Sequence, residues 1–302
     1  MDSPEWAVQA LPCDDGAQLR LWRPNLAERP ARLHFAHATG FHAHTYAPLF
    51  AALGADLPLA AWDMRGHGHS GPAGDPKRFA GWARYAADLG GWLRAQPEPV
   101  WLAGHSVGAT VSAMAAAAQP ERVAGLILIE PVLVPPLPGL LLRLGQLLDR
   151  PNITPLSAGA RRRRDRFVDH AQALAAWRGR GAFRSWPEEW LLAYVRHALE
   201  PDPGGAGLRL RCRPEFEGRS FDRTLAWPWG LLRRLPQPPL VLLGGCAQST
   251  TGEASRRALR RVQPRARLRV WPQASHFLPM EHTAEVAAAI RAAMADGRVA
   301  DA

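Results

Sequence analysis

The chain has few of the residues and segments that would mark it as secreted, membrane-spanning or stabilised by a metal ion. Lys77 is the only lysine, and three cysteines, Cys13, Cys212 and Cys246, stand far apart with no CxxC pair. Isolated cysteines indicate neither a disulfide framework nor a zinc site, so reduced thiols in a cytoplasm are expected. The most apolar stretch, residues 137–148, is interrupted by Arg143 and is too short to span a bilayer.

A secretory signal is also lacking, because the first residues, MDSPEWAVQA, contain no basic segment followed by an apolar run. We therefore expect a soluble cytoplasmic protein with no membrane partner. At 302 residues and 47% hydrophobic content, the chain is long enough for one α/β domain with an insertion. The composition predicts no particular oligomeric state.

Acidic charge is scarce relative to basic charge, and the formal net charge of +10 comes almost wholly from arginine. Such a charge would suit a nucleic-acid partner. The arginines are dispersed, however, and no nucleic-acid motif is present, so we expect no such partner. The one basic run, from Arg161 to Arg164, is interpreted as a helix face paired with Asp165 and Asp169. The alternative is that it binds an anionic substrate group or an acidic partner.

The most informative stretch is residues 100–110, VWLAGHSVGAT. An apolar run leads into Gly104, Ser106 and Gly108 in the pattern GxSxG, and sequence of helical character continues to Ala118. A strand that enters a helix through GxSxG places the serine in a sharp, strained turn with its hydroxyl exposed at the sheet edge. The alternative is a glycine-rich turn whose serine only caps the helix.

With this motif between an apolar run and a helix, the chain resembles the serine-nucleophile branch of the α/β hydrolases, over residues 30–134 and 236–295. The resemblance implies an α/β fold with a mostly parallel, eight-stranded sheet flanked by helices. It further implies that residues 1–134 form the first part of the core, 135–235 an inserted helical lid, and 236–302 the second part of the core.

The inserted region contains clustered prolines and recurring tryptophans. Its pattern predicts helices over residues 140–148, 158–178 and 187–199, and a short strand within 208–213. Because a lid in this position would cover the nucleophile, we expect its side chains to select the substrate.

A second motif, DMRGHGHS at residues 63–70, resembles the loop after the fourth strand of the family. Its implied role is structural. Asp63 and Arg65 are expected to tie the loop to its neighbours by charge-assisted hydrogen bonds, and His67 and His69 are not expected to be catalytic.

The resemblance also assigns the base and the oxyanion hole. The family keeps its catalytic histidine in the loop after the last strand, which here contains His276. A loop like residues 37–41 supplies one oxyanion amide, by position that of Thr39, and Val107 after the nucleophile supplies the other. Ala38 departs from the family pattern, which often has glycine there.

His37, His42 and His44 crowd the same loop, and three histidines could suggest a metal site. Their spacing is incomplete for such a site, and no cluster of carboxylates lies nearby in the sequence. We expect them to brace the loop or line the cleft, and we expect no metal.

The acidic partner of the base is missing from its commonest place, because no carboxylate follows the strand at residues 239–243 until Glu253. Glu130 ends the buried strand at residues 123–129, where an unpaired charge would be costly. A carboxylate there could accept a hydrogen bond from the histidine, so Glu130 is the predicted acid. The alternatives are that Glu130 braces the lid and Gln248 or no residue orients the base, or that Glu253 swings in.

The predicted function is that of a serine hydrolase, which cleaves a carboxylic ester or related acyl bond of a small molecule through an acyl-enzyme on Ser106, without cofactor or metal. Serine at this position argues against the epoxide hydrolases and haloalkane dehalogenases of this scaffold, which use a carboxylate. Thioesterase, lactonase, carbon–carbon bond hydrolase and cofactor-free perhydrolase activities stay open, as does a non-catalytic small-molecule-binding protein.

Overall fold

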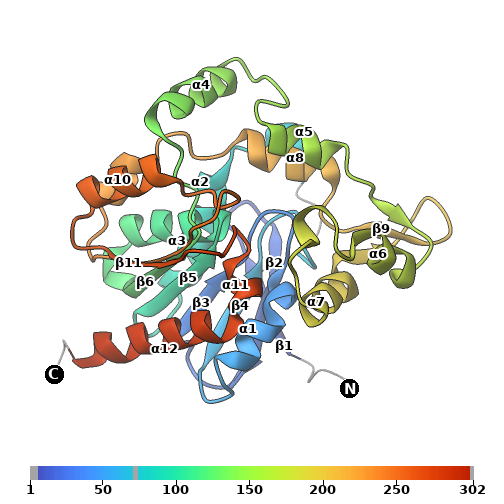
Figure 1. Cartoon of the computed structure of the whole chain (residues 1–302). Coiled ribbons are helices and arrows are strands. Elements are labelled where there is room, and N and C mark those ends of the chain that lie inside the picture. The colour runs from blue at the N-terminus through green and yellow to red at the C-terminus, as the bar shows by residue number, and fades with distance from the viewer. Residues whose placement is uncertain (1–5, 71–73, 300–302) are drawn as a thin grey trace.

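An eight-stranded sheet runs through the middle of the molecule (Figure 1), with the strand order β1-β2-β4-β3-β5-β6-β10-β11. The computed structural model describes residues 6–70 and 74–299; residues 1–5, part of the segment used to argue against a secretory signal, lie outside it. Neighbouring strands from β4 to β11 pair in parallel, and β2 runs antiparallel to both β1 and β4. The predicted mostly parallel α/β sheet is therefore confirmed. Its strands are β1 (Ala7–Pro12), β2 (Gln18–Asn25), β3 (Leu33–Ala36), β4 (Leu59–Asp63), β5 (Val100–His105), β6 (Val123–Ile129), β10 (Leu240–Gly244) and β11 (Arg267–Trp271).

The central strands are buried on both faces, which explains why they are continuously apolar in the sequence. In β6, Leu126 and Leu128 belong to one hydrophobic cluster, whereas Ile127 and Ile129 belong to the other. Successive side chains of a strand point to opposite faces, so each strand contributes to both halves of the core.

Helices cover both faces of this sheet (Figure 1). Helices α1 and α12 pack together in one cluster, while α2 and α3 pack together in the other with the buried residues of α10 and of α9 (Pro228–Arg233). The core helices are α1 (Ala47–Ala52), α2 (Trp82–Arg94), α3 (Val107–Ala118), α10 (Glu253–Val262), α11 (Leu278–Glu281) and α12 (Thr283–Val299). Short 3-10 turns lie at Ala43–Tyr46, Pro76–Arg78, Pro120–Arg122 and Gly181–Phe183.

The segment between β6 and β10 adds six further helices and a small three-stranded sheet of order β7-β9-β8. We call residues 135–235 the insert. Its elements are α4 (Pro136–Leu147), α5 (Pro155–Arg161), β7 (Arg166–Phe167), α6 (His170–Trp177), α7 (Glu188–Ala198), β8 (Leu199–Pro201), β9 (Leu208–Leu210), α8 (Pro214–Asp222) and α9 (Pro228–Arg233).

The single helix predicted over residues 158–178 is wrong. Helix α5 ends at Arg161, and the chain then pairs with β9 through β7. A new helix, α6, begins because the Asp169 side chain accepts a hydrogen bond from the backbone N–H of Gln172, 2.7 Å away, and so caps its first turn. Helices α8 and α9 were not predicted.

The pairing predicted between the arginine run and Asp165 and Asp169 is also wrong, because the ion-pair partners of Arg161 and Arg163 come from α8. The Arg161 guanidinium lies 2.8 Å from Asp222, and Arg163 lies 2.7 Å from Glu217. These ion pairs bind the end of α5 to α8 across 61 and 54 positions of the chain, which a local charge pattern does not reveal. Asp165 instead lies 3.6 Å from Arg213.

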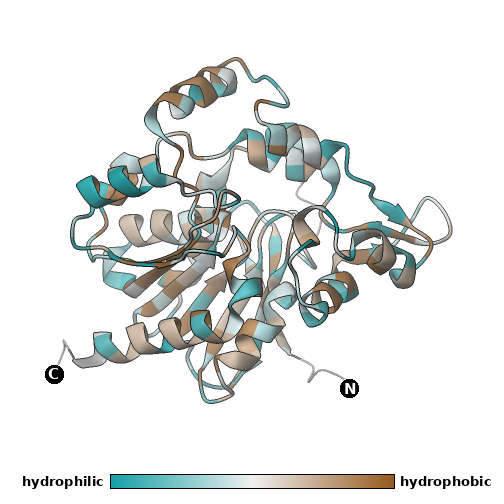
Figure 2. Cartoon of the chain, viewed as in Figure 1, coloured by the Kyte–Doolittle hydropathy of each residue, from teal (hydrophilic) through white to brown (hydrophobic). Residues whose placement is uncertain are grey.

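Helix α4 stands away from the body of the molecule (Figure 2), and most of its leucines are exposed. Two residues face the rest of the molecule: Gly139 lies against the backbone of Ala226, and Leu142 is buried. The exposed leucines of α4 and its C-terminal cap are Leu137, Leu140, Leu141, Leu144, Leu147 and Leu148. No helix within the described residues combines the length and the apolar character that crossing a bilayer requires.

Candidate active site

Ser106 occupies the turn between β5 and α3 that the GxSxG pattern predicts. Its backbone has φ 58° and ψ −119°, a left-handed conformation that costs a non-glycine residue free energy. The turn requires the flanking glycines, because neighbouring backbone leaves no room for a side chain at Gly104 or Gly108. A methyl group on Gly108 would lie 2.1 Å from the carbonyl oxygen of Ala36, and one on Gly104 would lie 2.4 Å from the backbone of Gly108.

His276 lies in the loop between β11 and α11 and reaches the serine. Its Nε2 is 3.0 Å from the Ser106 Oγ, which is within hydrogen-bonding distance. The His276 side chain is 17% exposed and the whole of Ser106 only 9%. The two residues are 170 positions apart in the chain, and the parallel sheet brings them together because strands β5 and β11 end at the same edge.

Glu130 approaches the histidine from the other side. It follows β6 directly, is fully buried, and has a φ of 47°, a left-handed backbone conformation that strands do not adopt. Its Oε2 lies 3.1 Å from the His276 Nδ1. The structure therefore brings together the hydroxyl, the imidazole and the carboxylate that the sequence analysis selected.

The Glu130 carboxylate is held by donors from the loop after β10. The backbone N–H of Gly244 donates to Oε1 over 2.6 Å, and the Ser249 hydroxyl donates to it over 2.9 Å. The backbone N–H of Thr250 donates to Oε2 over 3.1 Å. These hydrogen bonds stabilise a charge that would otherwise be costly to bury. Sequence reasoning missed Ser249 and Thr250, although they stand in the segment where the family's aspartate was absent.

The two alternative partners for His276 make other contacts. The side-chain oxygen of Gln248 accepts a hydrogen bond from the Cys246 thiol. Glu253 is exposed in the first turn of α10. Neither is hydrogen-bonded to His276 within the described residues.

Thr39 and Val107 lie on two backbone segments in direct contact. A methyl group on Gly108 would clash with the carbonyl oxygens of Ala36 and His37, which shows how closely the loop after β3 approaches the start of α3. In the part of the chain that the structure describes, neither the Thr39 N–H nor the Val107 N–H has a hydrogen-bond acceptor. Two unpaired amides on adjoining segments are what an oxyanion hole requires.

His37 and His67 brace the backbone of the neighbouring loops, which for His37 is one of the two roles that the sequence analysis expected. His37 donates from Nδ1 to the carbonyl of Ala38 over 2.7 Å and accepts at Nε2 from the Met64 N–H over 2.8 Å. His67 contacts the carbonyl of Arg65. Burial lowers the pKa of His67 to about 4, so its ring is neutral near pH 7.

Asp63 and Arg65 also have the bracing role that the sequence predicted. Fully buried, Asp63 accepts hydrogen bonds from the backbone N–H groups of Ala43 and His69, each over 2.8 Å. Arg65 forms a bidentate pair with Asp88 on α2, at 2.8 and 3.0 Å. These contacts fix the loops after β3 and β4 at the edge of the sheet.

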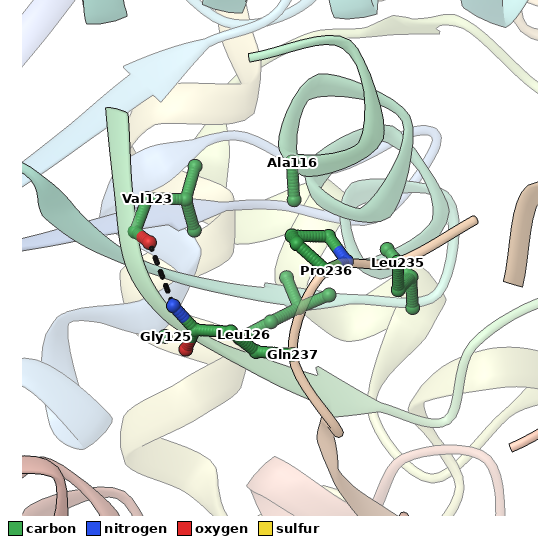
Figure 3. A pocket seen from close by; sticks show the side chains of 7 residues that line it. All are labelled: Ala116, Val123, Gly125, Leu126, Leu235, Pro236 and Gln237. Carbon is green, nitrogen blue, oxygen red and sulfur yellow. Dashed lines mark hydrogen bonds between the residues drawn. The ribbon is translucent and has the colours of Figure 1, made fainter. Parts of the chain in front are cut away.

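Two further features bear on ligands. Among the described residues, no group of three or more histidine, cysteine, aspartate or glutamate side chains is placed to hold a metal ion. The cavity in Figure 3 is lined by residues such as Val123 and Leu235 and lies at the start of β6, the strand whose far end precedes Glu130. At about 10 Å³ it has room for one water molecule at most.

Three aromatic rings from separate segments gather beside His276. Phe41 is the last residue of the loop after β3, Phe277 follows the histidine, and Trp186 comes from the insert. The Phe41 and Trp186 ring centroids are 5.1 Å apart, and those of Trp186 and Phe277 are 5.8 Å apart. The His276 and Phe277 centroids are 5.7 Å apart. The site therefore has an apolar wall next to its polar groups.

Comparison with known proteins agrees with this geometry. A profile of the alpha/beta hydrolase family matches residues 35–289, which span β3 to α12. The chain belongs to the alpha/beta hydrolase family. As a member of this family it also resembles two curated lipases. Monoglyceride lipase from Homo sapiens is 28% identical over 148 residues, 44% of this chain and 48% of the lipase. Monoglyceride lipase from Rattus norvegicus is 33% identical over 128 residues, 40% of this chain and 41% of the lipase. The chain thus matches less than half the length of each lipase.

Solved structures resemble this alpha/beta hydrolase over nearly its whole length. E-2-(acetamidomethylene)succinate hydrolase has a TM-score of 0.79 at 21% identity, covering 95% of this chain and 98% of its own. The thioesterase domain from the curacin biosynthetic pathway has a TM-score of 0.76 at 19% identity, covering 95% and 99%. An esterase from M. tuberculosis has a TM-score of 0.69 at 20% identity, covering 97% and 93%. At these identities the likeness shows the fold.

Proposed function

We propose that this protein is a serine hydrolase that cleaves a carboxylic ester, or a related acyl bond, of a small molecule. The observation that carries the proposal is the continuous contact from the Ser106 Oγ to His276, at 3.0 Å, and from His276 to Glu130, at 3.1 Å. This arrangement of hydroxyl, imidazole and buried carboxylate is the one that activates a serine nucleophile.

In the proposed reaction, Ser106 attacks the carbonyl carbon of the substrate while His276 Nε2 takes the proton of the hydroxyl. The charge that develops on the carbonyl oxygen is stabilised by the free N–H groups of Thr39 and Val107. His276 then gives its proton to the leaving alcohol, which departs as the ester C–O bond breaks.

The acyl-enzyme is hydrolysed by the same groups. Water loses a proton to His276 Nε2 and attacks the acyl carbon, and the proton returns to Ser106 as the acid is released. Glu130 accepts the Nδ1–H hydrogen bond throughout, which fixes the ring's tautomer and stabilises the imidazolium that forms twice in the cycle.

The apolar wall of Phe41, Trp186 and Phe277 favours an apolar acyl or alcohol group over a charged one. The two monoglyceride lipases among its relatives support ester hydrolysis by this chain. The proposed enzyme is therefore an esterase that acts on an apolar small molecule. The insert acts as a lid that covers part of its active site.

Hydrolysis of a series of p-nitrophenyl esters tests this proposal. The parent protein should hydrolyse a short-chain ester, and Ser106→Ala should reduce kcat by about 10³-fold or more while the protein stays folded. Equal turnover by the parent and Ser106→Ala would refute the assignment of the nucleophile.

A further inference from the structure

A buried chain of three hydrogen bonds connects the oxyanion loop, the nucleophile turn and the loop of the base. The backbone N–H of Ala38 donates to the Tyr46 hydroxyl oxygen over 3.1 Å. The Tyr46 hydroxyl lies 2.7 Å from the Nδ1 of His105, and the His105 Nε2 lies 2.8 Å from the backbone carbonyl oxygen of His276. Each of the three segments that it connects contains a group that the proposed reaction uses.

One arrangement of protons satisfies all of these contacts. The carbonyl of His276 can only accept, so the Nε2 of His105 must carry a proton. In a neutral ring the Nδ1 is then an acceptor, so the Tyr46 hydroxyl must donate to it. The hydroxyl oxygen is left to accept from Ala38, and no donor or acceptor in the chain competes with another.

The environment keeps this arrangement. Tyr46 and His105 are each 0% exposed, so water does not offer either side chain a substitute partner. Burial lowers the pKa of His105 well below its usual value, so the ring is neutral near pH 7. The ring of His105 also lies 5.0 Å, centroid to centroid, from that of His276.

We propose that Tyr46 and His105 are positioning residues, which set the distance between His276 and Ser106 and hold the oxyanion loop at the same time. His105 immediately precedes Ser106, so the hydrogen bond to His276 links the base to the nucleophile's own strand. Tyr46 extends this link to Ala38, the residue before the Thr39 amide. This inference deepens the proposed function and rests on it for its kinetic consequences.

The kinetic test compares Tyr46→Phe, His105→Phe and His105→Gln with the parent protein on a p-nitrophenyl ester. Loss of the link should lower kcat about 10- to 100-fold in Tyr46→Phe and His105→Phe, because small misplacements of reacting groups cost about that much. KM should change by less than about twofold, since no substrate contact is removed. His105→Gln should recover much of the loss, because its side-chain amide can still donate to the His276 carbonyl.

Tyr85→Phe is the matched control. Tyr85 is also 0% exposed, but it lies on α2, where its ring packs against Phe79 and His67. Loss of the Tyr85 hydroxyl should leave kcat unchanged. Parental kcat in Tyr46→Phe and His105→Phe, or an equal loss in Tyr85→Phe, would overturn the inference.

Crystal structures of the parent and of His105→Phe give a readout that needs no activity. The distance between the Ser106 Oγ and the His276 Nε2 should be near 3.0 Å in the parent and lie outside hydrogen-bonding range in His105→Phe. An unchanged distance in the variant would contradict a positioning role. If the parent protein hydrolyses no ester, the proposed function fails, while this comparison still decides whether His105 positions His276.

Discussion

Glu130 is the residue whose role depends most on three-dimensional context. It reaches His276 from the end of β6. The loop after β10, which carries the acid in the family's common pattern, here provides the hydrogen-bond donors that hold the Glu130 carboxylate. A glutamate at this point has a longer side chain than aspartate and accepts from both Gly244 and Thr250 while contacting the histidine. The arrangement reverses the parts that the two strand ends have in the family's common pattern.

Replacing Glu130 by Gln tests its role. The substitution removes the charge that stabilises the imidazolium, and it directs an amide group toward donors such as the Gly244 N–H. We expect kcat to fall by about 10³- to 10⁴-fold and thermal stability to fall as well. Glu253→Gln is the control because Glu253 is exposed on α10, and its kcat should stay within about twofold of the parent. Comparable rates for the Glu130→Gln protein and the parent would remove Glu130 from the mechanism.

At the residue scale, the positions of the reactive groups could be predicted because each follows a strand, apolar for Ser106 and Glu130 and assigned by the family resemblance for His276. Ser106, Glu130 and His276 come after β5, β6 and β11, and the ends of parallel strands meet at one edge. The supporting groups could not be predicted in this way. Ser249 is an ordinary loop residue in the sequence, and its contact with Glu130 exists only once the 119 positions that separate them have folded.

At the element scale, the turn from β5 into α3 has the strictest steric demand. A methyl group on Gly108 would collide with backbone atoms of Ala36 and His37, which have no flexible side chain to move away. Gly108→Ala should therefore displace the loop that carries Thr39, with loss of ester hydrolysis and a lower melting temperature.

Gly159→Ala is the matched control for this substitution. Gly159 lies in α5, and a methyl group there would have no neighbour within 4 Å. Alanine favours a helix by about 1 kcal/mol over glycine, so the melting temperature should stay the same or rise. Equal behaviour of the two variants, measured by thermal unfolding and ester hydrolysis, would contradict the tight contact between β3 and α3.

Helix α4 gives a second prediction at this scale. Leu140 and Leu144 are 61% and 54% exposed, whereas Leu142 is 6% exposed. Changing Leu140 and Leu144 together to Gln should alter the free energy of unfolding by less than about 1 kcal/mol. Leu142→Ala should cost about 2 kcal/mol or more, because it leaves a cavity. Urea denaturation measures both, and a large loss in the double variant would mean that the leucine face is covered in solution.

The insert is where the sequence was least informative at the element scale. Its helices are short, and the break between α5 and α6 depends on the Asp169 cap and on pairing between β7 and β9. The arginine run likewise looked like a solvated helix face. Its partners on α8 lie some fifty residues or more away, where a charge pattern has no signal.

At the scale of the whole molecule, many histidines are buried as neutral rings. Burial lowers the pKa of His34 to about 3 and that of His67 to about 4, both well below the unfolded value of about 6.5. At a pH between the folded and the unfolded pKa of such a histidine, the ring is protonated in the unfolded chain and neutral in the folded chain. The corresponding stability is complete above about pH 6.5 and is lost as the pH falls toward about 4.

The free energy of unfolding should therefore decline between about pH 7 and pH 5, before most carboxylates titrate. Each fully buried neutral histidine contributes a slope of up to about 1.4 kcal/mol per pH unit. Urea denaturation across this range measures the slope, and His67→Gln should make it shallower by about one histidine's share. A flat profile in the parent protein would contradict the neutral burial of these rings.

The fold as a whole was the most predictable feature. Buried parallel strands must be apolar on both faces, as β6 and β10 are, and this signal persists along the sequence. The order in which those strands pair was not predicted and required the three-dimensional structure. Contacts between the insert and the core, such as that of Trp186 with Phe41, required the three-dimensional structure.

The central claim is that Ser106 is a nucleophile activated by His276 and Glu130. Intact-protein mass spectrometry after treatment with a fluorophosphonate tests this most directly, because such a probe reacts with activated serines. We predict that one probe adds to the parent protein, maps to Ser106, is absent in Ser106→Ala and forms far more slowly in His276→Ala. A parent protein that stays unlabelled, or that is labelled at the same rate in Ser106→Ala, would contradict the claim.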